Sequence, residues 1–261
     1  MLKLFAIAAL FATLGFVSGA EPLRVYIRSG AKTHGPGLHE HPEFLKQWLA
    51  LLKERGAQVD GGADFPTAEK LAQTDVLLIY TADGGDLKED QRAALKTFLA
   101  RGGGLVTVLD GVCGHDPQWW KTVVGAAWEY GHTKWIYTRL TLHFLDAKHA
   151  VSAGAADFAL DDEVYDELHV IPDAKVLAQA EFPAKDAKPG DKPRAVPQVW
   201  ACEKDGYRAF TSIPGLRLTT FSVPAYRALL LRGIAWAGRR EKVDELCSQE
   251  ELQALKGTAK P

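Results

Sequence analysis

Residues 76–109 read VLLIYTADGGDLKEDQRAALKTFLARGGGLVTVL, and they contain a complete strand–helix–strand pattern. Val76–Tyr80 and Leu105–Leu109 are apolar without polar alternation, which is typical of parallel strands that are covered on both faces. Between them, Asp86–Ala100 carries leucine and phenylalanine at helical spacing and ends at a run of glycines. This stretch therefore predicts a right-handed βαβ unit.

The same alternation extends toward the N-terminus. Leu23–Ile27 is an apolar strand, and Pro42–Arg55 is an amphipathic helix with proline in its first turn. Ala57–Asp60 and Thr67–Gln73 add a short strand and a short helix. Strands that alternate with helices predict an α/β fold with a doubly wound, mostly parallel sheet.

The second half of the chain has a different pattern. Apolar and polar residues alternate in Trp135–Leu145, which indicates a strand with one exposed face. Further short strands and two closing helices are expected at 176–179, 196–202, 207–212, 224–237 and 243–256. We expect these strands to form an antiparallel or mixed edge on the parallel core, within one domain, because no linker separates two halves.

The first twenty residues have the pattern of a secretory signal peptide. Lys3 precedes an apolar run, Leu4–Val17, and the small residues Ser18–Ala20 follow it. The apolar run is too short for a comfortable membrane span. We expect cleavage after Ala20 and an exported, periplasmic protein, with one domain over residues 21–240 and a C-terminal helix and tail over 241–261.

The charge balance argues against polyanionic partners. The chain has 31 basic and 33 acidic residues, and loss of Lys3 with the signal leaves 30 − 33 = −3. Neither nucleic acid nor an anionic membrane surface is recruited by such a chain. We therefore expect a small-molecule ligand, no nucleic acid, and no membrane after signal cleavage; the sequence leaves the oligomeric state open.

The chain has three cysteines, and an odd number in an exported protein leaves at most one disulfide. Cys113 and Cys202 each lie at or near a predicted strand end, so they form the pair to test first. Cys247 is expected in the C-terminal helix. No CxxC motif or Cys/His zinc spacing occurs.

Polar loops follow three of the predicted parallel strands. They are Ser29–His41, Thr81–Asp86 and Asp110–Asp116. The carboxyl ends of parallel strands meet at one edge of a sheet, where open α/β folds place ligands. The residues expected at this rim are His34, His39, Glu40, His41, Asp83, Asp86, Asp110, His115 and Asp116. Exposure and turn formation alone also explain polar loops, but the histidines exceed what turns require.

The first of these loops reads SGAKTHGPGLHEH and allows three interpretations. His39 and His41 could be two ligands of a divalent metal if the loop folds tightly. One histidine could instead act as a general acid or base. One or two of the histidines could also hold the loop together through hydrogen bonds.

Gly111-Val112-Cys113-Gly114 follows a buried strand and has the form of a nucleophile elbow. A cysteine at a helix N-terminus has a lowered thiol pKa and is more nucleophilic. Against this, residue 115 is histidine where the glutaminase-type elbow GxCxG has glycine. A disulfide or an inert cysteine is the competing interpretation.

An acidic run over residues 161–167 is followed by His169. Its default interpretation is a solvated face. If it is extended, Glu163, Tyr165 and Glu167 share one side. Tyr165 and Trp200 could then line a sugar pocket.

Five blocks of sequence carry a family resemblance: HGPGLHEH, DLKEDQRAALKTFLARGGGLVTVL, DEVYDELHV, VWACEKDGYRAFTS and YRALLLRGIAWAGR. Their order and spacing resemble the ThuA-like (trehalose utilisation) family over about residues 23–240. The resemblance implies a flavodoxin-like sheet of the class I glutamine amidotransferase type, usually without a working glutaminase triad. It also implies a role in the metabolism of disaccharides, including trehalose and 3-keto sugars.

By position, the resemblance points to residues in the first loop, the third loop and helix, the turn before the fourth strand, and the acidic block. They are His34, Gly35, Gly37, His39, Glu40, His41, Asp86, Gln91, Gly103, Gly104, Glu163 and Tyr165. The chain departs from the pattern at Asp110, where many relatives have histidine. It also reads Gly215-Leu216-Arg217-Leu218-Thr219 where many have Gly-Leu-His-x-His.

The function expected from these patterns is acid–base chemistry on a sugar at the C-terminal edge of the sheet. The catalytic candidates are His39 or His41 as proton carrier, with Glu163 or Asp110 as partner. The substrate-binding candidates are His34, Glu40, Asp83, Asp86, His115 and Tyr165. The sequence establishes no cofactor, and a divalent metal at His39 and His41 stays open. The alternatives are a non-catalytic sugar-binding module and a thiol-dependent amidase or isomerase built on Cys113.

Overall fold

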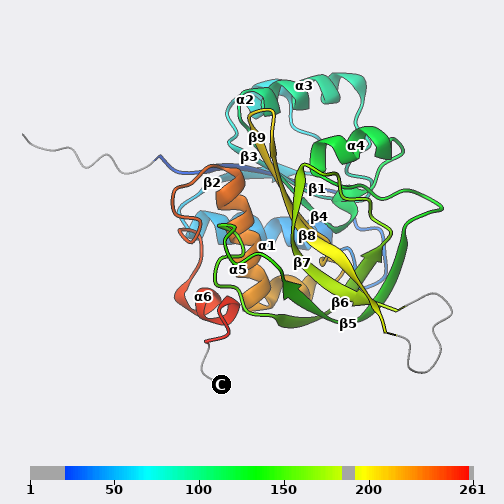
Figure 1. Ribbon diagram of the computed structural model, residues 1–261. Helices are drawn as coiled ribbons and strands as arrows, with labels where there is room; N and C mark the ends of the chain where they lie inside the picture. The colour runs from blue at the N-terminus through cyan, green and yellow to red at the C-terminus, as the bar shows by residue number, and fades with distance from the viewer. Residues whose placement is uncertain (1–20, 184–191, 259–261) are drawn as a thin grey trace, which may run out of the picture.

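A computed structural model of the chain describes residues 21–183 and 192–258. Nine strands form one sheet in the described residues, in the order β2-β1-β3-β4-β9-β8-β7-β5-β6 (Figure 1). The parallel part comprises β1 (Arg24–Ser29), β2 (Gln58–Gly62), β3 (Val76–Tyr80), β4 (Gly104–Val108) and β9 (Tyr207–Ser212). The predicted doubly wound α/β fold of the class I glutamine amidotransferase type is confirmed.

The second half of the chain forms the expected antiparallel edge. It comprises β8 (Arg194–Lys204), β7 (Ala174–Phe182), β5 (Lys134–Phe144) and β6 (Phe158–Asp166). β5 pairs with β7 only through His143 and Phe144, and the rest of β5 pairs with β6. The β5–β6 pair therefore projects from the sheet as a ribbon of its own.

Helices cover both faces of the parallel strands. One face carries α1 (His41–Glu54) and α5 (Pro224–Ala237), and the other carries α2 (Ala68–Ala72), α3 (Glu89–Ala100) and α4 (Pro117–Val124). β3 and β4 are buried along their whole length, as their apolar sequences predict. A Cβ atom on Gly104 would lie 2.3 Å from the carbonyl oxygen of Ala237, so glycine is needed where α5 meets β4.

Two short 3-10 helices, η1 (Leu109–Val112) and η2 (Leu218–Ser222), lie beside the carboxyl ends of the parallel strands. The chain ends with α6 (Gln249–Leu255), which Ser248 and Glu251 cap reciprocally. Arg55 of the α1 C-terminus donates to Glu251 over 3.1 Å, and Leu255 is fully buried. The C-terminal helix thus packs on the domain.

The structure differs from the expectation at several elements. β6 is a strand, and residues 162–166 are buried, so the interpretation of the acidic run as a solvated face is wrong. α4 was not among the expected helices. Cys247 lies in the turn before α6 and not inside the helix.

Cys113 and Cys202, the pair to test first for a disulfide, are not bonded to each other, and all three cysteines are free. Cys113 and Cys202 pack in two separate hydrophobic clusters, so their thiols have no common site. The expected signal peptide, residues 1–20, lies outside the described residues. No helix within 21–183 or 192–258 is both long and apolar enough to cross a bilayer.

Candidate functional site

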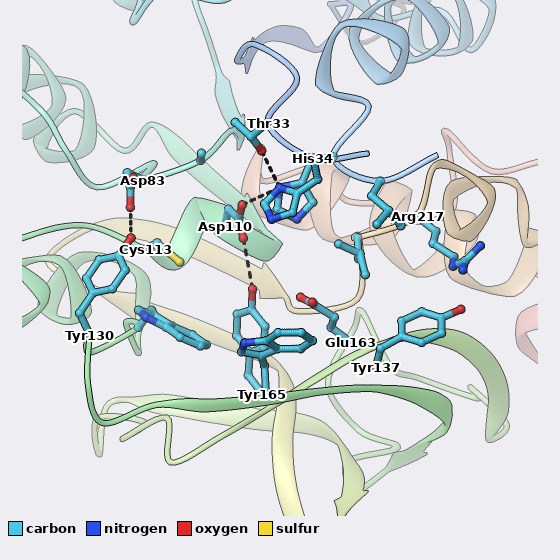
Figure 2. A pocket seen from close by; sticks show the side chains of 16 residues that line it. Thr33, His34, Asp83, Asp110, Cys113, Tyr130, Tyr137, Glu163, Tyr165 and Arg217 are labelled. Atoms are coloured by element: carbon cyan, nitrogen blue, oxygen red, sulfur yellow. Dashed lines mark hydrogen bonds and ion pairs between the residues drawn. The ribbon is translucent and has the colours of Figure 1, made fainter. Parts of the chain in front are cut away.

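A cavity of about 570 Å³ opens at the carboxyl ends of β1, β3 and β4 (Figure 2). The sheet changes winding direction between β1 and β3, which is the position where open α/β folds bind ligands. The β5–β6 ribbon closes the opposite side. In that ribbon Trp135 pairs with Tyr165 and Tyr137 pairs with Glu163, and all four side chains line the cavity.

The histidine loop is fixed in place by the segment that precedes η2. The amide of His39 donates to the carbonyl of Leu216 over 2.9 Å, and Leu38 forms a β-bridge with Arg217. His39 itself has a φ of 45°, a left-handed conformation that a non-glycine residue adopts only under constraint. The histidine loop therefore has a fixed conformation and forms part of the cavity wall.

His39 and Asp110 form the polar centre of the cavity. The Nδ1 atom of His39 lies 2.9 Å from a carboxylate oxygen of Asp110 and 3.0 Å from the hydroxyl of Thr33. Tyr165 donates its hydroxyl to the other oxygen of Asp110 over 3.2 Å. The Asp110 carboxylate contacts both the His39 imidazole and the Tyr165 hydroxyl. These contacts define the position of the carboxylate and the orientation of the His39 ring. The strand order predicted that His39 and Asp110 lie at one edge, and Tyr165 was a separate binding candidate from the acidic run.

Glu163 lies beside this centre on β6. Burial raises the pKa of its carboxyl to about 7, and the negative charges of Asp110 and Asp162 add to the effect. A carboxyl group with such a pKa is populated in both protonation states at neutral pH, which is the property of a general acid or base. Of the acidic run, Glu163 and Tyr165 face the cavity, and Glu167 leaves the strand with a φ of 60°.

Asp162 points away from the cavity and anchors the segment before η2. Its carboxylate accepts from the amides of Gly215 and Leu216, each at 3.0 Å, and from the hydroxyl of Thr220. The group is fully buried and has no cationic partner among the described residues. Asp162 therefore ties β6 to the segment that carries Leu216 and Arg217 into the cavity wall.

His41 is behind the cavity and not in it. Its ring is fully buried, packs edge-on against Tyr80, and hydrogen-bonds through Nδ1 to the carbonyl of Ala31 at 2.7 Å. The expectation that His41 exchanges protons with a substrate is therefore wrong, because the ring does not reach the cavity. Burial lowers the pKa of His41, so its neutral form is favoured.

The Nε2 atom of His41 is buried and has no hydrogen-bond partner among the described residues. Ligand atoms of His39, His41 and Asp110 all lie within 4.8 Å of one another. A metal-ligating histidine usually donates its other ring nitrogen to a carbonyl or carboxylate, as His41 does to Ala31. The donor set of two imidazoles and one carboxylate fits a divalent cation.

The other predicted binding residues divide into two groups. His34 and Asp83 line the cavity, and the ring of His34 lies 3.9 Å from that of His39. Glu40 lies outside it, where it pairs with Lys32 and accepts from the amide of Gly37. Glu40 is thus part of the loop's own bonding.

Asp86 and His115 also lie outside the cavity wall. They bind each other through the ring and the backbone amide of His115. Their role in substrate binding is therefore not supported; the pair holds two loops together at the rim. Asp116, another residue expected at the rim, caps α4 by accepting from the amide of Trp119.

Aromatic side chains that were not among the predicted site residues form most of the remaining wall. Tyr130, Trp135 and Tyr137 are unusually exposed for large aromatic residues, at 57%, 56% and 43%. Tyr130 donates its hydroxyl to Asp83. The sequence feature that indicates this wall is the high density of aromatic residues in 128–137. Trp200, which was expected beside Tyr165, is instead fully buried and donates to the carbonyl of Val124.

The environment of Cys113 opposes a nucleophilic role. Burial raises the pKa of its thiol well above the ordinary value, and Asp110, Asp83 and Glu163 raise it further. Cys113 also precedes the first residue of α4 by several positions, with Asp116 as the helix cap. The thiol is therefore neutral and lacks the helix N-terminus that a reactive cysteine would use.

The sequence matches the family model for ThuA, trehalose utilisation, over residues 24–237. The chain belongs to the ThuA family. The ThuA model spans the whole sheet and every residue that lines the cavity. Membership links the chain to carbohydrate metabolism. A search of curated proteins finds no match.

Solved structures with the same fold include two ThuA-like proteins. One from Parabacteroides merdae has a TM-score of 0.65 at 17% identity, and covers 84% of this chain and 90% of its own. One from Bacteroides uniformis has a TM-score of 0.63 at 18% identity, with coverage of 88% and 96%. A cytoplasmic protein from Salmonella typhimurium has a TM-score of 0.57 at 13% identity, with coverage of 82% and 99%. These similarities concern the fold.

Proposed function

We propose that this ThuA-family chain is an exported enzyme that carries out acid–base chemistry on a sugar in the cavity. The substrate class is a disaccharide or a 3-keto sugar. The observation that carries the proposal is Glu163, a buried carboxyl with a pKa of about 7, in an aromatic cavity that also holds the His39–Asp110 pair.

The cavity wall has the composition of a sugar site. Sugar rings present apolar C–H faces and polar edges, so proteins bind them with aromatic surfaces and hydrogen-bonding side chains together. Trp135 and Tyr137 supply exposed aromatic faces on one side. Asp83, Asp110 and His34 supply hydrogen-bonding groups on the other.

Two groups of different kind are available to move protons. Glu163 exchanges its proton near neutral pH, so it serves as a donor to a leaving oxygen or as an acceptor of a proton from carbon or water. His39 is held by Asp110, whose carboxylate would stabilise a positive charge on the ring. Hydrolysis of a glycoside and removal of a proton beside a ketone both need two such groups, one on each side of the reacting atoms.

A divalent cation at His39, His41 and Asp110 is a second form of the same proposal. It is favoured by the unpartnered, buried Nε2 of His41. Such a cation would polarise a carbonyl oxygen or lower the pKa of a bound water. In that case Glu163 stays the proton carrier, and His39 and Asp110 serve as ligands.

The experiment is turnover of trehalose and of its 3-keto derivative by the purified protein, followed by proton NMR. We expect consumption of at least one of them, and loss of turnover with retained binding in Glu163→Gln. His143→Ala is the matched control, because His143 pairs with Asp157 on the surface of β5 and does not line the cavity. Binding without turnover under all conditions, with and without added divalent metal, would overturn the enzyme assignment in favour of a binding module.

Export is proposed from residues 1–20 alone. Expression of the full chain in a Gram-negative host, followed by N-terminal sequencing of the periplasmic fraction, tests it. Glu21 is the expected first residue. A cytoplasmic product that starts at Met1 would contradict export and leave the chemistry of the cavity unaffected.

A further inference from the structure

Arg217 differs from every other arginine in the described residues. Each of the others donates to at least one carboxylate or carbonyl oxygen of the chain. Arg217 lines the cavity, and no described residue forms an ion pair or a side-chain hydrogen bond with it. A guanidinium group carries five N–H donors and is always charged, so an unpartnered one in a cavity is available to a ligand.

The position of Arg217 is fixed by its backbone. Leu38 pairs with it in a β-bridge on one side, and the buried Asp162 accepts from the amide of Leu216 on the other. The guanidinium carbon lies 4.9 Å from the centre of the Tyr137 ring. This stacking orients the plane of the guanidinium and leaves its N–H edges free. Figure 2 shows Arg217 beside Tyr137, at the opposite end of the cavity from Tyr130.

The carboxylates of the cavity do not neutralise this charge. Asp83 accepts from Tyr130, and Asp110 is held by His39 and Tyr165. Glu163 is paired with Tyr137 across the ribbon, but it makes no ion pair with Arg217. Arg217 is thus the one cationic side chain, other than histidine, among the residues that line the cavity.

We infer that Arg217 binds the carboxylate of an acidic sugar, so that the ligand class of this cavity is a glycoside of a uronic or aldonic acid. The inference rests on the proposed function for the presence of a sugar. A carboxylate is planar and matches the guanidinium fork with two parallel hydrogen bonds. A phosphate dianion would gather more negative charge beside Asp110 and Glu163 than one arginine offsets.

Binding of two methyl glycosides that differ in one group tests the inference. Methyl glucuronide carries a carboxylate where methyl glucoside carries a hydroxymethyl group, and calorimetry at pH 7 gives both dissociation constants. We expect the wild-type chain to bind the glucuronide at least about tenfold more tightly. Arg217→Gln should reduce this preference to less than about twofold.

Arg139→Gln is the matched control. Arg139 lies on the β5–β6 ribbon, pairs with Asp161 and does not line the cavity, so its loss should leave both affinities unchanged. Glucose 6-phosphate tests the source of the anion, and we expect it to bind more weakly than the glucuronide. Equal binding of glucuronide and glucoside, a preference that survives Arg217→Gln, stronger binding of the phosphate, or no binding at all would each overturn the inference.

The test separates this inference from the proposed function. Glu163→Gln should abolish turnover and keep the preference for the glucuronide, because Arg217 is unchanged. A preference that depends on Arg217, in a protein that turns over no sugar, would support the acidic ligand and contradict the enzyme. Turnover of neutral sugars with no preference for the glucuronide would support the enzyme and contradict the acidic ligand.

Discussion

The Nδ1 atom of His39 lies 2.9 Å from a carboxylate oxygen of Asp110, although the two residues belong to segments that follow different strands. β1 leads to the histidine loop and β4 leads to Asp110, and both strands end at the same edge of the sheet. The hydroxyl of Thr33 lies 3.0 Å from the same nitrogen. The imidazole is therefore oriented by two groups, with Asp110 as the charged one.

Asp110→Asn tests whether this orientation serves chemistry. We expect kcat on the sugar substrate to fall about a hundredfold with little change in ligand affinity, because an amide cannot stabilise positive charge on His39. Asp157→Asn is the matched control. Asp157 accepts a hydrogen bond from His143 over 2.8 Å at the surface. Asp157→Asn therefore alters an equivalent histidine–aspartate pair that lies away from the cavity. Equal losses in both variants would contradict a catalytic role for the His39–Asp110 pair.

Glu163→Gln should make the protein more stable at neutral and higher pH. The pKa of Glu163 is about 7 in the folded chain against an ordinary value of 4.5, so the folded chain holds a proton that the unfolded chain releases. The free energy of unfolding of the wild type therefore falls as pH rises from about 4.5 to about 7. Glutamine has no charge to bury, so the variant avoids this loss, which reaches at most about 3 kcal/mol.

Urea denaturation of wild type and Glu163→Gln at pH 4.5 and pH 8 measures this difference. The two proteins should have similar stability at the lower pH, and the variant should be more stable at the higher pH. Activity should fall in the variant, because it lacks the Glu163 carboxyl that exchanges a proton in the cavity. A difference in stability that does not depend on pH would contradict the raised pKa.

Buried strands with apolar sequences were predictable, and β6 was not. β3 and β4 are covered on both faces, so their residues are apolar and the pattern is local. β6 buries Asp162 and Glu163, and acidic residues in a row normally indicate exposure. What permits the burial of Asp162 is supplied by Gly215, Leu216 and Thr220, far away in the sequence, and a local pattern carries no trace of such partners.

The candidate site, like the fold, has one part that the sequence predicts and another that it does not. His34, His39, Asp83 and Asp110 could be placed together because parallel strands bring their following loops to one edge. The aromatic wall depends on how the β5–β6 ribbon folds over that edge, which a strand pattern does not determine. His41 shows the converse case, because its loop was predicted correctly but its ring faces the core.

Asp162→Ala should destabilise the chain strongly. Removal of the carboxylate leaves the buried amides of Gly215 and Leu216 and the hydroxyl of Thr220 without their acceptor. We expect the free energy of unfolding to fall by about 3 kcal/mol, measured by urea denaturation at pH 7. Asp161→Ala is the control, since Asp161 is exposed on the same strand and should change stability by less than about 1 kcal/mol. Similar losses in the two variants would contradict the anchoring role of Asp162.

Zn²⁺ should raise the melting temperature of the wild type and not that of His41→Phe. The cation would bind the folded chain through His39, His41 and Asp110 and so stabilise it by an amount that grows with the logarithm of its concentration above Kd. Phenylalanine keeps an aromatic ring against Tyr80 and removes both ring nitrogens. His143→Phe controls for binding of zinc to surface histidines.

A chelator then tests whether the bound cation is needed for the reaction. Equal shifts in wild type and His41→Phe, or no shift in either, would contradict a cation at this centre. Where the shift depends on His41, turnover that is lost with a chelator and restored by Zn²⁺ assigns His39 and Asp110 as ligands. If turnover survives chelation, the reaction needs no cation, and Glu163 and the His39–Asp110 pair are the groups that move protons. These titratable side chains meet in the aromatic cavity, where the Nδ1 atom of His39 is held against the carboxylate of Asp110.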